Sequence, residues 1–291
     1  SQQDTCTGVA TAFTVLSVII VALRLYTRSF IVHNVGRDDI MMVLALIFTL
    51  GYLAAIYVAR DNGMGFSGAS LALVEMQNLI KVTLAIEIIY YILVFAIKVS
   101  ILFVYLRLAV NRTLERCTRV TIWILTVFVV ICVIVCLVQC TPLHKMWDFV
   151  GLVPGHCINT TAFFYSTSSF NIITDIWILV LPIPTLMAIQ RPKREKIALV
   201  GVFSLGVFST IASIVRLHSI RIFTESKDPF FDSVPVNLWS MIEVNIGIWC
   251  ASIPALKALV NRGQRERSRA AGNSGYKYHS RDKSGNQISA K

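Results

Sequence analysis

Residues 86–107, IEIIYYILVFAIKVSILFVYLR, decide the fold of this chain. The stretch is apolar almost throughout and exceeds the roughly 20 residues that a helix needs to cross a bilayer. Lys98 lies nine residues before Arg107, and at about 1.5 Å per residue its ammonium is roughly 13 Å inside the boundary that Arg107 marks. A charge at that depth is costly unless it is paired or hydrated, so Lys98 marks a candidate functional site.

The composition of the whole chain agrees with this interpretation. Hydrophobic residues make up 55% of the sequence and charged residues 15%, whereas a soluble domain has about 25% charged residues. The net charge of +11 could indicate a nucleic-acid partner. The basic residues, however, lie in short turns between apolar runs and in the last thirty residues. We therefore expect a lipid bilayer as the partner and no nucleic acid.

Seven apolar runs are long enough to span the hydrocarbon: residues 7–26, 40–59, 83–106, 120–140, 162–188, 197–217 and 236–260. The first run lacks a basic N-terminal region, so it is predicted to be an uncleaved span rather than a signal peptide. Because the chain opens on Ser1 and not on Met, we expect further residues upstream. The sequence thus predicts an all-α, polytopic membrane protein, with a seven-helix transmembrane domain over residues 1–260.

The loops between these runs predict the orientation. One side carries most of the Lys and Arg: Arg28, Arg37, Arg107, Arg112, Arg116, Arg119, Arg191, Lys193, Arg194, Lys196 and the basic residues after Asn261. The positive-inside rule assigns this side to the cytosol. We expect the N-terminus outside and the C-terminus in the cytosol of a multi-pass protein of the plasma membrane or an endomembrane. Residues 261–291 are basic, rich in Gly and Ser and without periodicity, which predicts a disordered tail.

The loop before the fifth run carries two candidate modification sites. Cys140 and Cys157 bracket it on the expected outer side, where an oxidising compartment favours a disulfide; a free, buried Cys140 is the alternative. Asn159 opens an Asn-Thr-Thr glycosylation sequon on the same side. Cys132, Cys136 and Cys140 form a helical stripe, but no His joins them within the membrane, so we expect no metal site.

Polar residues inside the runs predict either a pocket or a set of structural ion pairs. Asn171 and Asp175 lie four residues apart and share a helix face. The predicted ligand pocket, open to the outside, comprises Glu87, Tyr91, Lys98, Asn171, Asp175, Arg216, Trp239, Glu243 and Asn245. The alternative is that the charged members pair only to fix the register of the helices.

Two ion-pair partnerships are specific enough to predict. Lys98 should pair with Asp175, which lies at a similar depth, and not with Glu87, which is about 16 Å away on the same helix. At the cytosolic face Asp38 and Asp39 begin the second run, where the helix dipole favours acids. Arg24 and Arg28 end the first run, and their pairing with Asp38 and Asp39 is expected to be structural.

Taken in combination, these motifs resemble the fungal rhodopsin-domain family, which includes receptor-like proteins and proteins encoded in secondary-metabolite clusters. The matching residues are Arg24, Tyr26, Arg28, Gly36, Asp38 and Asp39; Lys98, Ser100, Leu102 and Arg107; Cys140, Pro142, Trp147, Gly155 and Cys157; Asn171, Asp175, Pro182 and Pro184; and Arg216, Trp239, Glu243, Asn245, Cys250 and Pro254. The family often has a Gly-Gly-His turn after the second span. Here residues 62–66 read NGMGF, so a role for that His does not transfer.

The resemblance implies a seven-helix membrane protein and leaves three functions open. The first is a receptor-like protein that binds a small molecule in the outer pocket and contacts a cytosolic signalling partner. The second is an intramembrane isomerase or cyclase, with Asp175 and Glu243 as acid and base and Lys98 as their electrostatic partner. A transporter is less favoured, because the runs are odd in number and show no inverted repeat. No cofactor is expected: a retinal Schiff base needs a lysine inside the seventh run, which has only Lys257 at its end.

Overall fold

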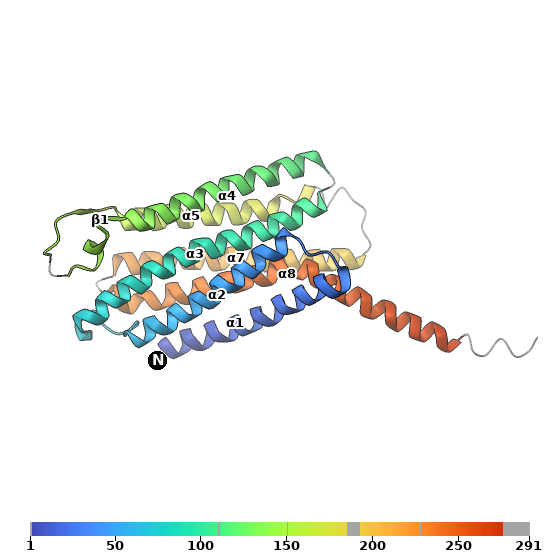
Figure 1. Cartoon of the computed structure of the whole chain (residues 1–291), viewed down its shortest axis with the longest axis horizontal. Coiled ribbons are helices and arrows are strands. Elements are labelled where there is room, and N and C mark those ends of the chain that lie inside the picture. Colours follow the sequence, from blue (N-terminus) through green and yellow to red (C-terminus); the bar gives the residue numbers. More distant parts are fainter. Residues whose placement is uncertain (1, 110, 150, 185–192, 227, 276–291) are drawn as a thin grey trace, which may run out of the picture.

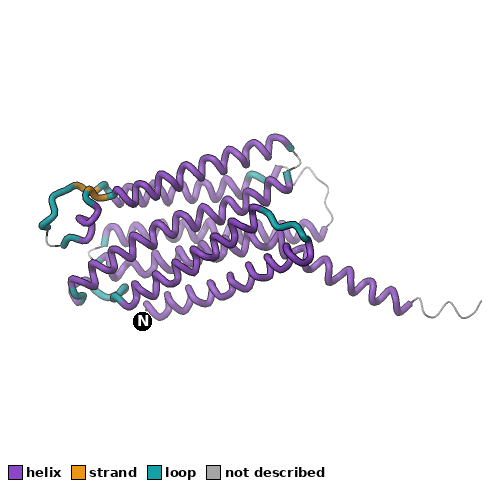
Figure 2. Tube along the Cα trace, viewed as in Figure 1, coloured by secondary structure: helices purple, strands orange, loops and turns teal. Residues whose placement is uncertain are grey.

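The computed structural model describes residues 2–109, 111–149, 151–184, 193–226 and 228–275. Within them, long helices run side by side along one axis (Figure 1). They are α1 (Gln2–Tyr26), α2 (Arg37–Asp61), α3 (Leu73–Leu108), α4 (Arg112–Val138), α5 (Thr160–Val180), α7 (Lys193–Glu225) and α8 (Pro229–Gly275). A π-helical turn, η1 (Thr27–Val32), prolongs α1, and the short 3₁₀ turns η2 (Gly68–Ser70) and η3 (Leu143–Trp147) lie in the connections. In Figure 2 the described residues are helical except for short loops and one pair of short strands.

Six of the described helices are long and apolar enough to cross a membrane. The exception is α5, which has 21 residues and carries Asn171, Asp175 and several Ser and Thr residues. The outward faces of the bundle are apolar: the exposed fraction is 71% for Trp123 and 64% for Ile173. So many exposed apolar side chains are compatible with a lipid surrounding, because lipid tails are as apolar as the side chains themselves. The predicted all-α, multi-pass membrane protein is therefore confirmed.

The helices form a closed ring with α3 and α8 in contact across it. Around the ring, α1 packs on α2 and α8, α3 on α2 and α4, and α7 on α5 and α8. Between α4 and α5, the rings of Phe128 and Phe170 stack with centroids 4.0 Å apart, and Trp177 Nε1 donates to Thr121 Oγ1 over 3.0 Å. Because α3 and α8 meet inside the ring, polar residues such as Lys98 of α3 and Glu243 of α8 are buried.

A disulfide hairpin lies at the same end of the bundle as the N-terminus (Figure 1). Its two short strands, β1 (Cys140–Thr141) and β2 (His156–Cys157), pair antiparallel, and Cys140 is bonded to Cys157. This confirms the predicted disulfide. We call this the hairpin end and the opposite one, from which α8 projects, the tail end. The loop charges predict that the N-terminus and the Cys140–Cys157 loop lie on the same side of the membrane, and in the structure both lie at the same end of the bundle.

Two helix ends differ from the sequence-based boundaries. The helix α8 continues to Gly275, so residues 261–275 of the predicted disordered tail are helical; their Arg, Gln, Glu and Ala residues are good helix formers, and this propensity outweighs the scattered Gly. Residues 276–291 lie outside the described part of the chain. The helix α5 ends at Val180, eight residues before the expected end, just ahead of Pro182 and Pro184, which cannot continue a regular helix.

Candidate functional site

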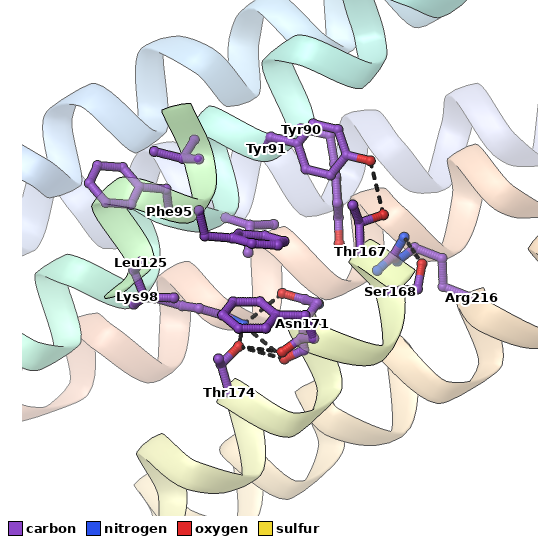
Figure 3. Close-up of a pocket in the computed structure, with 14 residues that line it drawn as sticks. Tyr90, Tyr91, Phe95, Lys98, Leu125, Thr167, Ser168, Asn171, Thr174 and Arg216 are labelled. Carbon is purple, nitrogen blue, oxygen red and sulfur yellow. Dashed lines mark hydrogen bonds between the residues drawn. The ribbon is translucent and has the colours of Figure 1, made fainter. Parts of the chain in front are cut away.

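The Lys98 ammonium is held in the middle of the bundle by one face of α5. Its Nζ lies 2.9 Å from Asp175 Oδ1 and donates to Asn171 Oδ1 and Thr174 Oγ1 at 2.6 Å each and to the Asn171 carbonyl at 2.9 Å (Figure 3). Thr174 and Asp175 lie three and four positions after Asn171, so all three are on the same side of α5. The predicted pair of Lys98 with Asp175 is confirmed. Only 5% of the Lys98 surface is exposed.

A second buried ion pair joins α7 to α8. Arg216 Nε donates to Glu243 Oε2 over 2.8 Å, and the guanidinium lies over the ring of Tyr90, 4.6 Å from its centroid. The other carboxylate oxygen, Glu243 Oε1, accepts from Asn171 Nδ2 at 2.7 Å, Ser213 Oγ at 2.8 Å and Tyr90 Oη at 3.0 Å. Both oxygens of the Glu243 carboxylate therefore have hydrogen-bond partners inside the bundle.

Two polar side chains connect the ion pairs into one network. Asn171 accepts from Lys98 through its carbonyl oxygen and donates to Glu243 through its amide nitrogen. Ser213 Oγ lies 3.0 Å from Asp175 Oδ2 and 2.8 Å from Glu243 Oε1. A hydroxyl has one proton, so Ser213 donates to one carboxylate at a time. The network therefore spans α3, α5, α7 and α8 and contains a hydrogen bond that can exchange between two acids.

Two small cavities border this network. The hairpin-side cavity, of about 30 Å³, lies among α3, α4, α5 and α7; Tyr91, Thr167 and Arg216 contribute to its polar wall (Figure 3). The tail-side cavity, of about 60 Å³, is lined by Asp175, Glu243 and Tyr105 among others, and Lys98 lines both. A water molecule needs about 10–15 Å³ of such space, so these cavities have room for a few waters. Any larger ligand requires side chains to move.

Three predicted pocket residues lie outside these two cavities. Asn245 faces α1, where its Oδ1 accepts from Ser17 Oγ over 2.6 Å. It is two positions from Glu243, which on a helix is roughly the opposite face. Trp239 is half-buried and lines neither cavity, and the Glu87 carboxylate is 3.5 Å from Tyr91 Oη without lining either cavity. The remaining predicted residues, Tyr91, Lys98, Asn171, Asp175, Arg216 and Glu243, are gathered around the network.

The network also contains residues that the sequence analysis did not identify. They are Tyr90, Ser168, Thr174 and Ser213. Each lies three, four or eight positions from a residue that was identified, as Tyr90 does from Lys98 and Ser213 from Arg216. Extending each polar face by whole helical turns would have found them.

At the tail end, Arg24 is fully buried and ties three helices together. Its Nη2 and Nε contact Asp38 Oδ2 at 2.7 Å and Asp39 Oδ1 at 2.9 Å, and its Nη1 donates to the Ala251 carbonyl of α8. Arg28 lies farther away, 3.5 Å from Asp38 and 3.9 Å from Asp39. The predicted pairing of these four residues is confirmed. Every one of these contacts joins one helix to another, as expected of residues that hold the helices together.

Comparison with known proteins assigns the fold to a family. The sequence profile of the fungal rhodopsin domain matches residues 23–262. The chain belongs to the fungal rhodopsin domain family. The matched segment contains the whole network, from Lys98 to Glu243, and the Arg24 anchor. No solved structure matches the chain significantly.

Several fungal proteins of known name are similar to this family member. A SAT4 family membrane protein of Emericella nidulans is 29% identical over 77% of this chain and 58% of its own length. The polyenoic acids biosynthesis gene cluster protein Ba17b of Metarhizium anisopliae is 27% identical over 86% of this chain and 72% of its own length. The receptor GIN3 of Arthrobotrys oligospora is 26% identical over 85% of this chain and 60% of its own length. The chain thus spans about six tenths of the first and third of these relatives.

Proposed function

We propose that this protein is receptor-like: a small molecule entering the hairpin-side cavity rearranges the ion-pair network, and the rearrangement is transmitted to the cytosolic end. The observation that carries the proposal is that one hydrogen-bonded network joins α3, α5, α7 and α8 and borders a cavity. A ligand that breaks or moves one pair changes the packing of all four helices. Packed interfaces shift between discrete arrangements, which is how a local event reaches a distant face.

The similarity to the receptor GIN3 supports this proposal. The proposal includes an orientation with the hairpin end outside and the tail end cytosolic, residues 1–260 as the membrane domain and residues 261–291 as a basic cytosolic tail. A C-terminal epitope tag should then be accessible to antibody only after the cells are permeabilised. Staining of intact cells would reverse the orientation and place the hairpin-side cavity on the cytosolic side.

The receptor proposal predicts a response that depends on the network. In a strain that lacks the gene, the transcript response to an organic extract of its own culture medium should be lost, and the wild-type gene should restore it. Asp175→Asn should fail to restore it, because the amide cannot neutralise Lys98. Glu225→Gln, which breaks an exposed pair with Arg221 on the same bundle, is the matched control and should restore it fully. A normal response in the deletion strain would remove the receptor proposal.

An intramembrane isomerase or cyclase is the second candidate, favoured by one specific observation. Asp175 and Glu243 flank the single hydroxyl of Ser213 at 3.0 and 2.8 Å, an arrangement in which a proton can pass between two carboxyl groups. Relatives whose names place them in biosynthetic clusters, such as Ba17b, agree with it. Metabolite profiling of the deletion strain distinguishes the candidates: a precursor that accumulates indicates an enzyme, and changed transcripts without such a precursor indicate a receptor.

A further inference from the structure

The guanidinium of Arg216 has one donor nitrogen that no described residue uses. Its Nε donates to Glu243 and its Nη1 to Ser168 Oγ over 3.4 Å, whereas Nη2 is buried and has no hydrogen-bond partner among the described residues. Only 6% of the side chain is exposed, and Arg216 lines the hairpin-side cavity (Figure 3). Leaving a buried charged donor without an acceptor is costly, and an acceptor atom that enters the adjoining cavity would remove that cost once the Arg216 side chain turns toward it.

We propose that the hairpin-side cavity binds neutral, largely apolar molecules through a carbonyl oxygen, which accepts a hydrogen bond from Arg216 Nη2. The inference deepens the proposed function and rests on it, since it names the class of ligand for the same cavity. Most of the wall around this donor is apolar or aromatic, with Phe95, Leu125, Phe128 and Phe170 among its residues. Such a wall suits an apolar body, and a few placed polar groups orient it.

The charges already present select a carbonyl over a carboxylate. Lys98 and Arg216 are matched by Asp175 and Glu243 at 2.9 and 2.8 Å, so the network carries no net charge. A carboxylate ligand would add an uncompensated anion inside the bundle, where unpaired charge is expensive. A carbonyl oxygen satisfies the free N–H without adding charge, and it brings no proton that would need its own acceptor.

The structure also indicates how room for such a ligand is made. The hairpin-side cavity has room for only a few waters, but Val94 and Lys98 line both it and the tail-side cavity. In this proposal, a rotamer change of these two side chains joins the cavities. Ligand entry is then coupled to the Lys98–Asp175 pair, which is the link that the proposed function needs.

Matched small probes test the inference with the full chain in lipid nanodiscs. Acetophenone, ethylbenzene and benzoate share a benzene ring and differ in offering a carbonyl, no acceptor or a carboxylate. We expect calorimetric titration to give acetophenone roughly tenfold or more tighter binding than either other probe, as one hydrogen bond from a charged donor provides. The infrared carbonyl stretch of isotope-labelled acetophenone should move to lower wavenumber on binding.

Two lysine variants assign the effect to the proposed nitrogen. Arg216→Lys keeps a positive charge beside Glu243 but removes the forked second donor, so it should lose the acetophenone preference and the infrared shift. Arg221→Lys changes an exposed arginine on the same helix, paired with Glu225, and should keep both. If Arg216→Lys does not fold, the ranking of the probes on the wild type and the infrared shift still decide the matter.

The possible outcomes separate this inference from the receptor proposal. Equal binding of acetophenone and ethylbenzene, tighter binding of benzoate, or no binding of any probe each overturns the carbonyl site. Selective binding in nanodiscs together with an unchanged transcript response in the deletion strain keeps the site and removes the receptor role. A lost transcript response without carbonyl selectivity keeps the receptor role and removes the site.

Discussion

Lys98 shows what an ammonium needs in order to stay inside this bundle. Its three N–H groups meet four acceptors, three of them neutral oxygens and one the carboxylate of Asp175. The neutral oxygens satisfy hydrogen bonding, but only Asp175 compensates the charge. The two roles are therefore separable by mutation, although one helix face supplies both.

A double-mutant cycle on Lys98 and Asp175 should show strong coupling. Lys98→Met or Asp175→Leu alone should each lower the free energy of unfolding by about 3–5 kcal/mol, because the survivor is left buried and uncompensated. The double variant should recover much of that loss in thermal unfolding in detergent. Removing the exposed Arg221–Glu225 pair in the same way should change stability by less than about 1 kcal/mol. If the stability losses of Lys98→Met and Asp175→Leu add up in the double variant, the predicted coupling is wrong.

The tail-end arginines should differ in importance although they share their partners. Arg24 is fully buried with contacts of 2.7 and 2.9 Å, and 14% of Arg28 is exposed with contacts of 3.5 and 3.9 Å. Arg24→Met should destabilise by about 3–5 kcal/mol, since it removes the shortest cation contacts of two buried aspartates and leaves them only the longer ones from Arg28 and Arg107. Arg28→Met should cost less than Arg24→Met, because its contacts are longer and its side chain is partly exposed. Similar melting temperatures for the two variants would mean that burial does not set the strength of this cluster.

At the scale of elements, one acid helps to join two connections at the hairpin end. Asp228, just before α8, accepts at Oδ1 from the Gly68 amide of η2 over 3.0 Å. Hydrogen bonds from the Ser67 side chain and from the Gly68 amide hold the pKa of the Asp228 carboxyl below its ordinary value of 3.8. The carboxylate form is thus the one that joins the α2–α3 connection to the start of α8.

This contact should weaken in acid and not in base. A lowered folded-state pKa means that Asp228 stabilises the connection fully above about 3.8, its pKa in the unfolded chain, and that the effect is lost as the pH falls through the lower folded-state pKa. The hydrogen-exchange protection factor of the Gly68 amide should fall over that range. Asp228→Asn keeps an acceptor but cannot titrate, so its protection should not follow pH. If the protection of the Gly68 amide falls equally in acid in the wild type and in Asp228→Asn, a group other than Asp228 is responsible.

Element by element, sequence predicted the axial position of a residue better than its rotation about the helix. Depth follows from counting residues at a fixed rise, which is why Lys98 and Asp175 were paired correctly. Rotation depends on which neighbour a helix packs against, and that information lies in the other helices. Asn245 was therefore expected in the pocket but faces Ser17 of α1, and the bridging roles of Asn171 and Ser213 were not foreseen.

At the scale of the whole molecule, the sequence was sufficient for the membrane class and for the disulfide. Length and apolarity identify spans because the bilayer imposes both, and the disulfide followed from two cysteines on the oxidising side of a short loop. The contact of α3 with α8 across the ring was not predictable, because apolar helices in lipid carry no binary pattern that marks the buried face. The helical residues 261–275 were also missed, because composition was read without helix propensity.

The polarity of α5 has a consequence for how the protein is made. An Asp costs up to about 2.5–3.5 kcal/mol on the scale of translocon insertion, the most at the centre of a helix; Asp175 lies in the second half of α5, which also carries Asn171. The ribosome delivers α3, with Lys98, before α5, so the lysine can receive Asp175 as α5 leaves the translocon. Translation into microsomes with a glycosylation reporter after α5 should show less insertion for Lys98→Met and more for Asp175→Leu. If Lys98→Met leaves insertion unchanged, α5 enters the bilayer without help and meets its partner only during later folding.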